Sequence, residues 1–104
     1  MVVKSITSYS ELQALIASGS PVAIDFYATW CGPCRMISPR FEQFSEKFAN
    51  IHFIKVDVDQ AQEIAAAMSI TAMPTFIFFK GGKEVTKVIG ADPSELESAL
   101  SRIA

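Results

Sequence analysis

Residues 22–34 read VAIDFYATWCGPC, an apolar run that passes directly into two cysteines three positions apart. Residues 22–28 are apolar almost without a break, which is typical of a strand covered on both faces and predicts a central, parallel strand. Only Asp25 interrupts it. Cys31 and Cys34 follow at the carboxyl end of this strand, where α/β folds tend to place their sites. The stretch therefore predicts a central strand and a functional site at its end.

The segments on either side alternate between strand and helix patterns. After the cysteines, apolar residues at intervals of four, three and four predict a helix that carries Pro39 as a kink and not as a break. The other predicted elements are a strand at 2–4, a helix from a Ser8–Glu11 capping box to about Ser18, a strand at 51–58, a helix at 60–68 capped by Asp59, a strand at 75–79, a Gly81-Gly82 hairpin, a strand at 85–89 and a last helix from Asp92-Pro93. This order predicts an α/β fold with a mixed sheet and helices on both faces.

Length and composition limit the function classes. A chain of 104 residues, 50% of them hydrophobic and 19% charged, is expected to form a single domain over residues 1–104 and not a disordered chain. Nine basic and eleven acidic side chains are scattered, so no basic stripe predicts a nucleic-acid partner. No apolar run approaches the roughly 20 residues of a membrane span, and the N-terminal stretch does not resemble a cleavable signal peptide. We expect no membrane association and residence in the compartment of synthesis.

The two cysteines are placed for thiol chemistry. Cys31 is expected at a helix N-terminus, where unpaired backbone N–H groups and the helix dipole favour thiolate over thiol. Cys34, one turn further along, is expected to be more shielded yet close enough to attack a mixed disulfide formed at Cys31. The spacing therefore predicts a nucleophile and a resolving thiol that together reduce a target disulfide.

Other uses of the pair remain open on the residues alone. A structural bridge is disfavoured because so short a loop yields only about 2 kcal/mol in the chain-entropy model. A zinc site needs about four ligands, and His52, expected to be an ordinary surface or packing residue, is the only histidine. A metal cluster shared across a dimer stays a third possibility.

The motif and its surroundings resemble the thioredoxin family over essentially the whole chain. The matching positions are the run from Asp25 to Cys34, Pro39, Met73-Pro74-Thr75, Gly81-Gly82 and Gly90. The resemblance implies the thioredoxin fold, a central mixed five-stranded sheet flanked by four helices, and a cytoplasmic protein-disulfide reductase that acts on disulfide-containing target proteins. It also implies recharging by thioredoxin reductase, which uses NADPH and FAD, with no metal or other cofactor bound to this chain itself.

The resemblance also assigns roles to individual residues. Asp25 becomes the proton acceptor for the buried cysteine, with Lys55 as its partner, although a strand lysine in solvent is the plainer interpretation of Lys55. Pro74 is implied to follow a cis bond, so that the preceding backbone can pair with an extended substrate. The implied substrate-binding residues are Trp30, Gly32, Pro33, Met73, Pro74, Gly90 and Ala91.

Several alternatives accompany these roles. Trp30 has core packing as its alternative, and Tyr27 is interpreted as a tolerated variation where many family members have tryptophan. A non-catalytic interaction module is a second function class, since a docking surface can matter more than a dithiol. An oxidising isomerase of the secretory pathway is a third, disfavoured by Pro33 between the cysteines and by the lack of a recognisable signal sequence.

Overall fold

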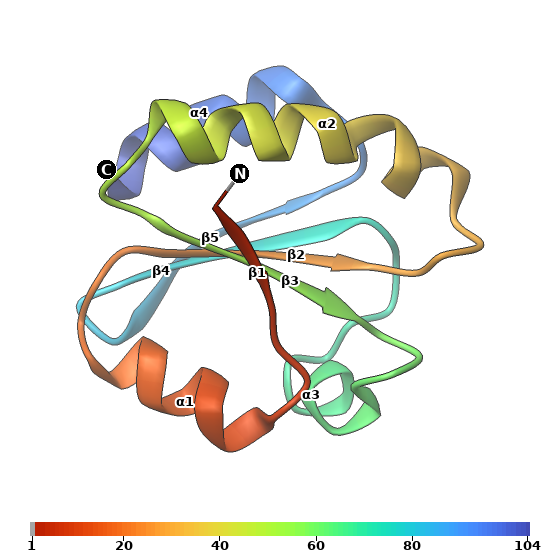
Figure 1. Cartoon of the computed structure of the whole chain (residues 1–104), viewed down its shortest axis with the longest axis horizontal. Coiled ribbons are helices and arrows are strands. Elements are labelled where there is room, and N and C mark those ends of the chain that lie inside the picture. The colour runs from red at the N-terminus through yellow and green to blue at the C-terminus, as the bar shows by residue number, and fades with distance from the viewer. Residues whose placement is uncertain (1) are drawn as a thin grey trace.

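The computed structural model describes residues 2–104, and Met1, the first residue of the predicted domain, lies outside them (Figure 1). The elements in chain order are β1 (Val3–Ser5), α1 (Tyr9–Ala17), β2 (Val22–Tyr27), α2 (Gly32–Lys47), β3 (His52–Asp57), α3 (Gln62–Ala67), β4 (Thr75–Lys80), β5 (Lys83–Ile89) and α4 (Pro93–Ile103). Their order confirms the predicted alternation. Within these residues, no helix is both long and apolar enough to cross a bilayer.

The sheet has five strands in the order β1-β3-β2-β4-β5, with β2 at its centre. β2 runs parallel to β3, and β3 parallel to β1, whereas β4 is antiparallel to both β2 and β5. The mixed sheet is therefore confirmed, but β2 is parallel on one side only. The hairpin between β4 and β5 is closed by the tight Gly81-Gly82 turn, whose two positive φ values of 65° and 79° return the chain beside β4.

Helices cover both faces of the sheet, α2 and α4 on one side and α1 and α3 on the other (Figure 1). Alternate residues of β2 enter the two cores, because side chains of a strand point to opposite faces. Ala23 belongs to the core beneath α2 and α4, whereas Ile24 and Phe26 belong to the core that includes residues of α1 and α3. Asp25, two residues after Ala23, therefore faces α2.

The apolar stripe of α2 packs on the sheet as its spacing predicts. Phe41 is buried against Phe53 of β3 and Phe76 of β4, with ring centroids 5.0 and 5.6 Å away. The helix continues through Pro39 to Lys47, so the proline does not break it. Aromatic burial on this scale fixes α2 on the sheet, and it fixes the start of the helix above the carboxyl end of β2.

Several details of the elements differ from the prediction, and β1 and β3 each begin one residue later than predicted. Asp59 does not cap α3, which begins at Gln62 after an N-cap residue, Ala61, that makes no side-chain cap. The amides of Gln60 and Ala61 instead donate to the Asp57 carbonyl, and this turn delays the helix. β5 begins two residues early, because its pairing continues down to the hairpin turn. In the Ser8–Glu11 capping box, Ser8 accepts from the Glu11 amide, but the Glu11 carboxylate is ion-paired with Lys4.

The cap of α4 gives a first prediction. Asp92 Oδ1 accepts hydrogen bonds from the amides of Ser94 (3.0 Å) and Glu95 (3.3 Å). Asp92→Ala is expected to lower the free energy of unfolding by about 1 kcal/mol, because two amides at the helix start lose their acceptor. Urea unfolding measures the change, and Asp92→Asn, which keeps an acceptor, is the control. Equal stability of the alanine variant and the unchanged protein would contradict the prediction.

Candidate active site

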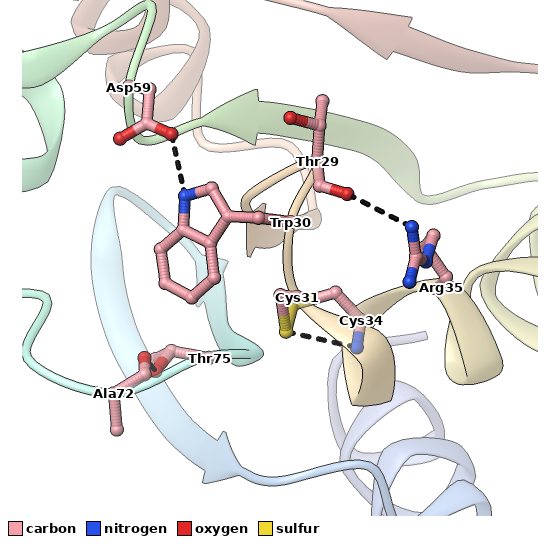
Figure 2. The surroundings of a disulfide bond; sticks show 8 residues. All are labelled: Thr29, Trp30, Cys31, Cys34, Arg35, Asp59, Ala72 and Thr75. Atoms are coloured by element: carbon pink, nitrogen blue, oxygen red, sulfur yellow. Dashed lines mark hydrogen bonds between the residues drawn. A yellow bond between two sulfur atoms is a disulfide. The ribbon is translucent and has the colours of Figure 1, made fainter.

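Cys31 lies at the junction of β2 and α2 and is the N-cap residue of that helix. Its Sγ accepts a hydrogen bond from the backbone amide of Cys34 at 3.2 Å, and the two sulfurs form a disulfide (Figure 2). Pro33 occupies the first turn, where its missing N–H group costs no hydrogen bond. The structure is therefore that of the oxidised protein, with both cysteines in one helical turn.

The surroundings of the two sulfurs favour negative charge at Cys31. Sγ of Cys31 lies at the N-cap of α2, where it faces an amide donor and the positive end of the helix dipole, and these groups stabilise a negative charge on that sulfur. Cys31 and Cys34 are 5% and 2% exposed, so the predicted difference in shielding has the right direction and is small. The helix start can stabilise a thiolate at position 31 more directly than at position 34.

Asp25 lies beneath this helix as a buried carboxyl group. It is 4% exposed, and among the described residues no group donates a hydrogen bond to its Oδ1. Burial raises the pKa of Asp25 to about 7, and the positive charge of Lys55 opposes part of that rise. Lys55 is the registered neighbour of Asp25 on β3, yet within residues 2–104 no ion pair of 4 Å or less joins them. Asp25 can thus exchange a proton near neutral pH.

Asp25 and Cys34 both line a cavity of about 200 Å³. Residues that contribute to its wall include Asp25, Tyr27, Cys34, Arg35, Ser38 and Lys55. Tyr27 packs against a buried cluster of Ala28, Cys31 and Cys34, called the cysteine cluster below. The pKa of Tyr27 is raised by burial and by the carboxylates of Asp57 and Asp25. Sequence reasoning treated Tyr27 as a tolerated variation, although the two-residue period of β2 already put it on the face of Asp25.

The loop before β4 brings a second group of predicted residues to the cysteines. Met73 packs against the cysteine cluster, and the bond from Met73 to Pro74 is cis, as the resemblance implied. The amide of Gly90 donates to the Pro74 carbonyl at 2.9 Å, with Gly90 at a φ of 104° that side chains rarely adopt. This bond ties the end of β5, and with it Ala91, to the proline loop.

Trp30 lies on the surface beside Cys31 and is 66% exposed, which excludes the core-packing alternative. Its indole Nε1 donates to Asp59 Oδ2 at 2.9 Å, and Figure 2 shows the indole nitrogen turned toward that carboxylate. Gly32 and Pro33 are exposed next to it. Sequence reasoning missed the contact with Asp59, because 29 positions separate the two residues and no local pattern joins them.

In the described part of the chain, no three His, Cys, Asp or Glu side chains are grouped in a way that could hold a metal ion. His52 lies exposed at the start of β3.

A sheet of this topology with a disulfide in the first turn of a helix defines a dithiol–disulfide oxidoreductase. The family model described as Thioredoxin matches residues 2–102. The chain belongs to the thioredoxin family, and it is a protein-disulfide reductase that works by dithiol–disulfide exchange.

Relatives resemble the chain over nearly its whole length. Thioredoxin-1 of Schizosaccharomyces pombe is 45% identical over 98 residues, which cover 94% of this chain and 95% of the relative. The crystal structure of Malassezia sympodialis thioredoxin has a TM-score of 0.93 at 45% identity and covers 99% of this chain and 94% of its own. The oxidised mitochondrial thioredoxin 3 of Saccharomyces cerevisiae has a TM-score of 0.92 at 39% identity, with 96% and 94% covered. The fold assignment therefore agrees with that of solved structures.

Proposed function

We propose that Cys31 is the attacking sulfur and Cys34 the resolving sulfur of the reductase. The Cys31 thiolate attacks one sulfur of a target disulfide, forms a mixed disulfide and releases the other target sulfur as a thiolate that takes up a proton. Cys34, deprotonated, then attacks the Cys31 sulfur and releases the second target thiol. Two electrons pass to the target, and the Cys31–Cys34 disulfide of the structure is the product.

Asp25 serves in this scheme as the proton acceptor for Cys34. The cavity that both residues line supports the role, because a proton can cross it without passing through apolar core. A pKa of about 7 supports it further, since such a carboxyl group is present in both protonation states near neutral pH. Lys55 acts as the partner of Asp25, because its positive charge stabilises the ionised carboxylate and limits the rise of its pKa.

Target proteins dock around the cysteines. An extended substrate segment pairs with the backbone of Met73 beside Pro74, which is a form of strand addition. Apolar contacts surround this segment at Trp30, Gly32, Pro33, Gly90 and Ala91. Near the disulfide, Trp30 is exposed and Met73 is half-buried, and a segment that approaches Cys31 must pass both side chains. This arrangement supports the proposed docking surface.

The oxidised protein returns to the dithiol by reaction with thioredoxin reductase, a flavoprotein that draws its electrons from NADPH. We propose that this chain binds neither NADPH nor FAD itself and that residues 1–104 act as a single thioredoxin domain. The cytoplasm is the compartment in which such a reductase system would keep it reduced. Fractionation of cells that express the chain checks the compartment, and recovery in mitochondria would overturn it.

The disulfide at the N-terminus of α2 is the observation on which this function chiefly depends. Turnover of insulin disulfides with NADPH and a thioredoxin reductase tests it directly. The protein is expected to be reduced by the enzyme and to support continuous NADPH oxidation only when insulin is present. No NADPH oxidation above the reductase alone would overturn both the proposed partner and the proposed direction of exchange.

The reactivity of the two thiols gives a second prediction. In the reduced protein at neutral pH, limiting iodoacetamide is expected to alkylate Cys31 about tenfold or more in preference to Cys34, because the helix start favours the thiolate at position 31. Peptide mass spectrometry measures the ratio. The Cys34→Ser variant is the control and should be alkylated at Cys31 at a similar rate. Preferential alkylation of Cys34 would contradict the assignment of the nucleophile.

A further inference from the structure

The side chain of Thr75, the first residue of β4, holds the loop that precedes this strand, and the proposed reaction gives it no role. Thr75 Oγ1 donates a hydrogen bond to the carbonyl oxygen of Ala72 at 2.6 Å (Figure 2). Thr75 is 3% exposed, and in the sheet it lies between Phe26 of β2 and Ile89 of β5. The hydroxyl group is therefore a buried donor on a fixed strand.

This hydroxyl is the restraint on the backbone of the loop. Within residues 2–104, the peptide groups of positions 71–73 make no hydrogen bond besides the one from Thr75. The backbone that follows is held differently, because the Pro74 carbonyl accepts from the Gly90 amide at 2.9 Å. The orientation of the peptide group after Ala72 therefore depends on the Thr75 hydroxyl.

That peptide group is also the one that carries the Met73 N–H. A peptide group is planar, and in its trans form the C=O and N–H bonds point in opposite directions. The bond from Ala72 to Met73 is trans, so a carbonyl turned toward the Thr75 hydroxyl turns the Met73 N–H away from it. In the described part of the chain, no group accepts a hydrogen bond from this N–H. Because Met73 packs against the cysteine cluster, a free backbone donor lies beside the disulfide.

We propose that Thr75 is a positioning residue for polypeptide disulfides, whose hydroxyl group turns the Met73 N–H toward the incoming target segment. An N–H that is already held in one direction need not be ordered when an extended segment pairs with it, so less binding free energy is lost. A small disulfide without peptide groups makes no such pairing. The inference rests on the proposed pairing of targets with the Met73 backbone, and it names the group that orients this backbone.

Single-turnover oxidation of the pre-reduced protein by two disulfides tests the selectivity. Thr75→Val, which removes the hydroxyl group and keeps the branched shape, is expected to slow oxidation by insulin about fivefold and oxidation by bis(2-hydroxyethyl) disulfide less than about twofold. Thr75→Ser is the matched control, because it keeps the hydroxyl group, and its insulin rate should stay within about twofold of the unchanged protein. Equal slowing with both disulfides, no slowing with insulin, or an equal loss in the serine variant would overturn the proposal.

Hydrogen exchange at the Met73 amide gives a readout that a merely structural role of Thr75 would not change. In a Cys34→Ser background, the Cys31 thiolate attacks the cysteine sulfur of a peptide activated as its thionitrobenzoate disulfide, releases thionitrobenzoate and keeps the peptide as a mixed disulfide. With ¹⁵N-methionine labelling, the Met73 amide is expected to exchange about tenfold more slowly in this complex than in the mixed disulfide with 2-mercaptoethanol, which has no peptide group. Adding Thr75→Val should reduce this difference to less than about threefold.

The outcomes separate this inference from the pairing on which it rests. Unslowed exchange in the peptide complex of the Cys34→Ser protein itself would remove the pairing with Met73 and the inference together. Full slowing both with and without the hydroxyl group would overturn the role of Thr75 alone. If Thr75→Val does not fold, Thr75→Ala decides with the same two rates and the same amide.

Discussion

Cys31→Ser is expected to lower the turnover of insulin disulfides by about 10³-fold or more, because a serine hydroxyl forms no disulfide and can carry no electrons to the target. The loss should be as complete with dithiothreitol as the electron donor as with NADPH and thioredoxin reductase, since both routes pass through the same sulfur. Insulin precipitation and NADPH oxidation measure the two routes. Turnover by the variant at even a tenth of the normal rate would show that another group attacks the target.

Cys34→Ser is the matched variant, because it removes the other sulfur of the same turn. It is expected to lose turnover equally but to accumulate the mixed disulfide with its target, since Cys31 still attacks and nothing releases the complex. Intact-mass spectrometry detects the adduct, which Cys31→Ser should not form. A biological effect that survives Cys31→Ser in cells would favour the interaction module over the reductase.

The elements that sequence reasoning predicted best are those whose signal is local. The nearly continuous apolar run of β2 reflects burial on both faces of that strand, and the apolar spacing of α2 reflects burial of one face of that helix. Both elements lie where those patterns predict them. The N-cap at Asp92 is likewise a contact within four residues. Such features need no knowledge of the partner surface.

The features that were missed depend on contacts between distant segments. Asp59 is a residue type typical of a helix cap, but its carboxylate accepts a hydrogen bond from the Trp30 indole instead. The amides that follow it donate to the carbonyl of Asp57, so the helix starts later than predicted. The strand start at Lys83 depends on pairing with β4. The cysteine chemistry was predictable because it arises within a single helical turn, whereas the environment of Asp25 arises from β2, β3 and α2 together.

Asp25 makes the stability of the protein depend on pH, and the sign follows from its buried state. Its pKa is about 7 in the folded protein, against an ordinary value of 3.8. Below pH 3.8 the carboxyl group is protonated whether the chain is folded or unfolded. As the pH rises toward 7, the unfolded chain releases the proton while the folded protein holds it, so the free energy of unfolding falls by about 1.4 kcal/mol per pH unit. The total loss from this group is about 4 kcal/mol and is complete above about pH 7.

Asp25→Asn removes this titration. The variant is expected to match the unchanged protein within about 1 kcal/mol at about pH 3.5, where both side chains are mostly neutral, and to be more stable by about 3 to 4 kcal/mol at about pH 8. Urea unfolding across this range measures the difference. In Lys55→Gln, which removes the charge that lowers the pKa of Asp25, the loss of stability should extend to higher pH. A difference between Asp25→Asn and the unchanged protein that did not grow with pH would contradict the buried-carboxyl assignment.

The same substitution should impair the reaction while it stabilises the fold. In Asp25→Asn an amide replaces the carboxyl group, so Cys34 loses the proton acceptor proposed for it, and release of the mixed disulfide is expected to slow by about 10²-fold, since general bases contribute on that order. In the unchanged protein this release should accelerate as the pH rises through about 7, where Asp25 ionises, and the variant should lack that inflection. Stopped-flow measurement of mixed-disulfide decay distinguishes the two. A buried carboxyl group that weakens the folded state at neutral pH and yet speeds the second exchange step is what a carboxylate proton acceptor for Cys34 requires, because a carboxylate takes up a proton near neutral pH only when its anion is destabilised.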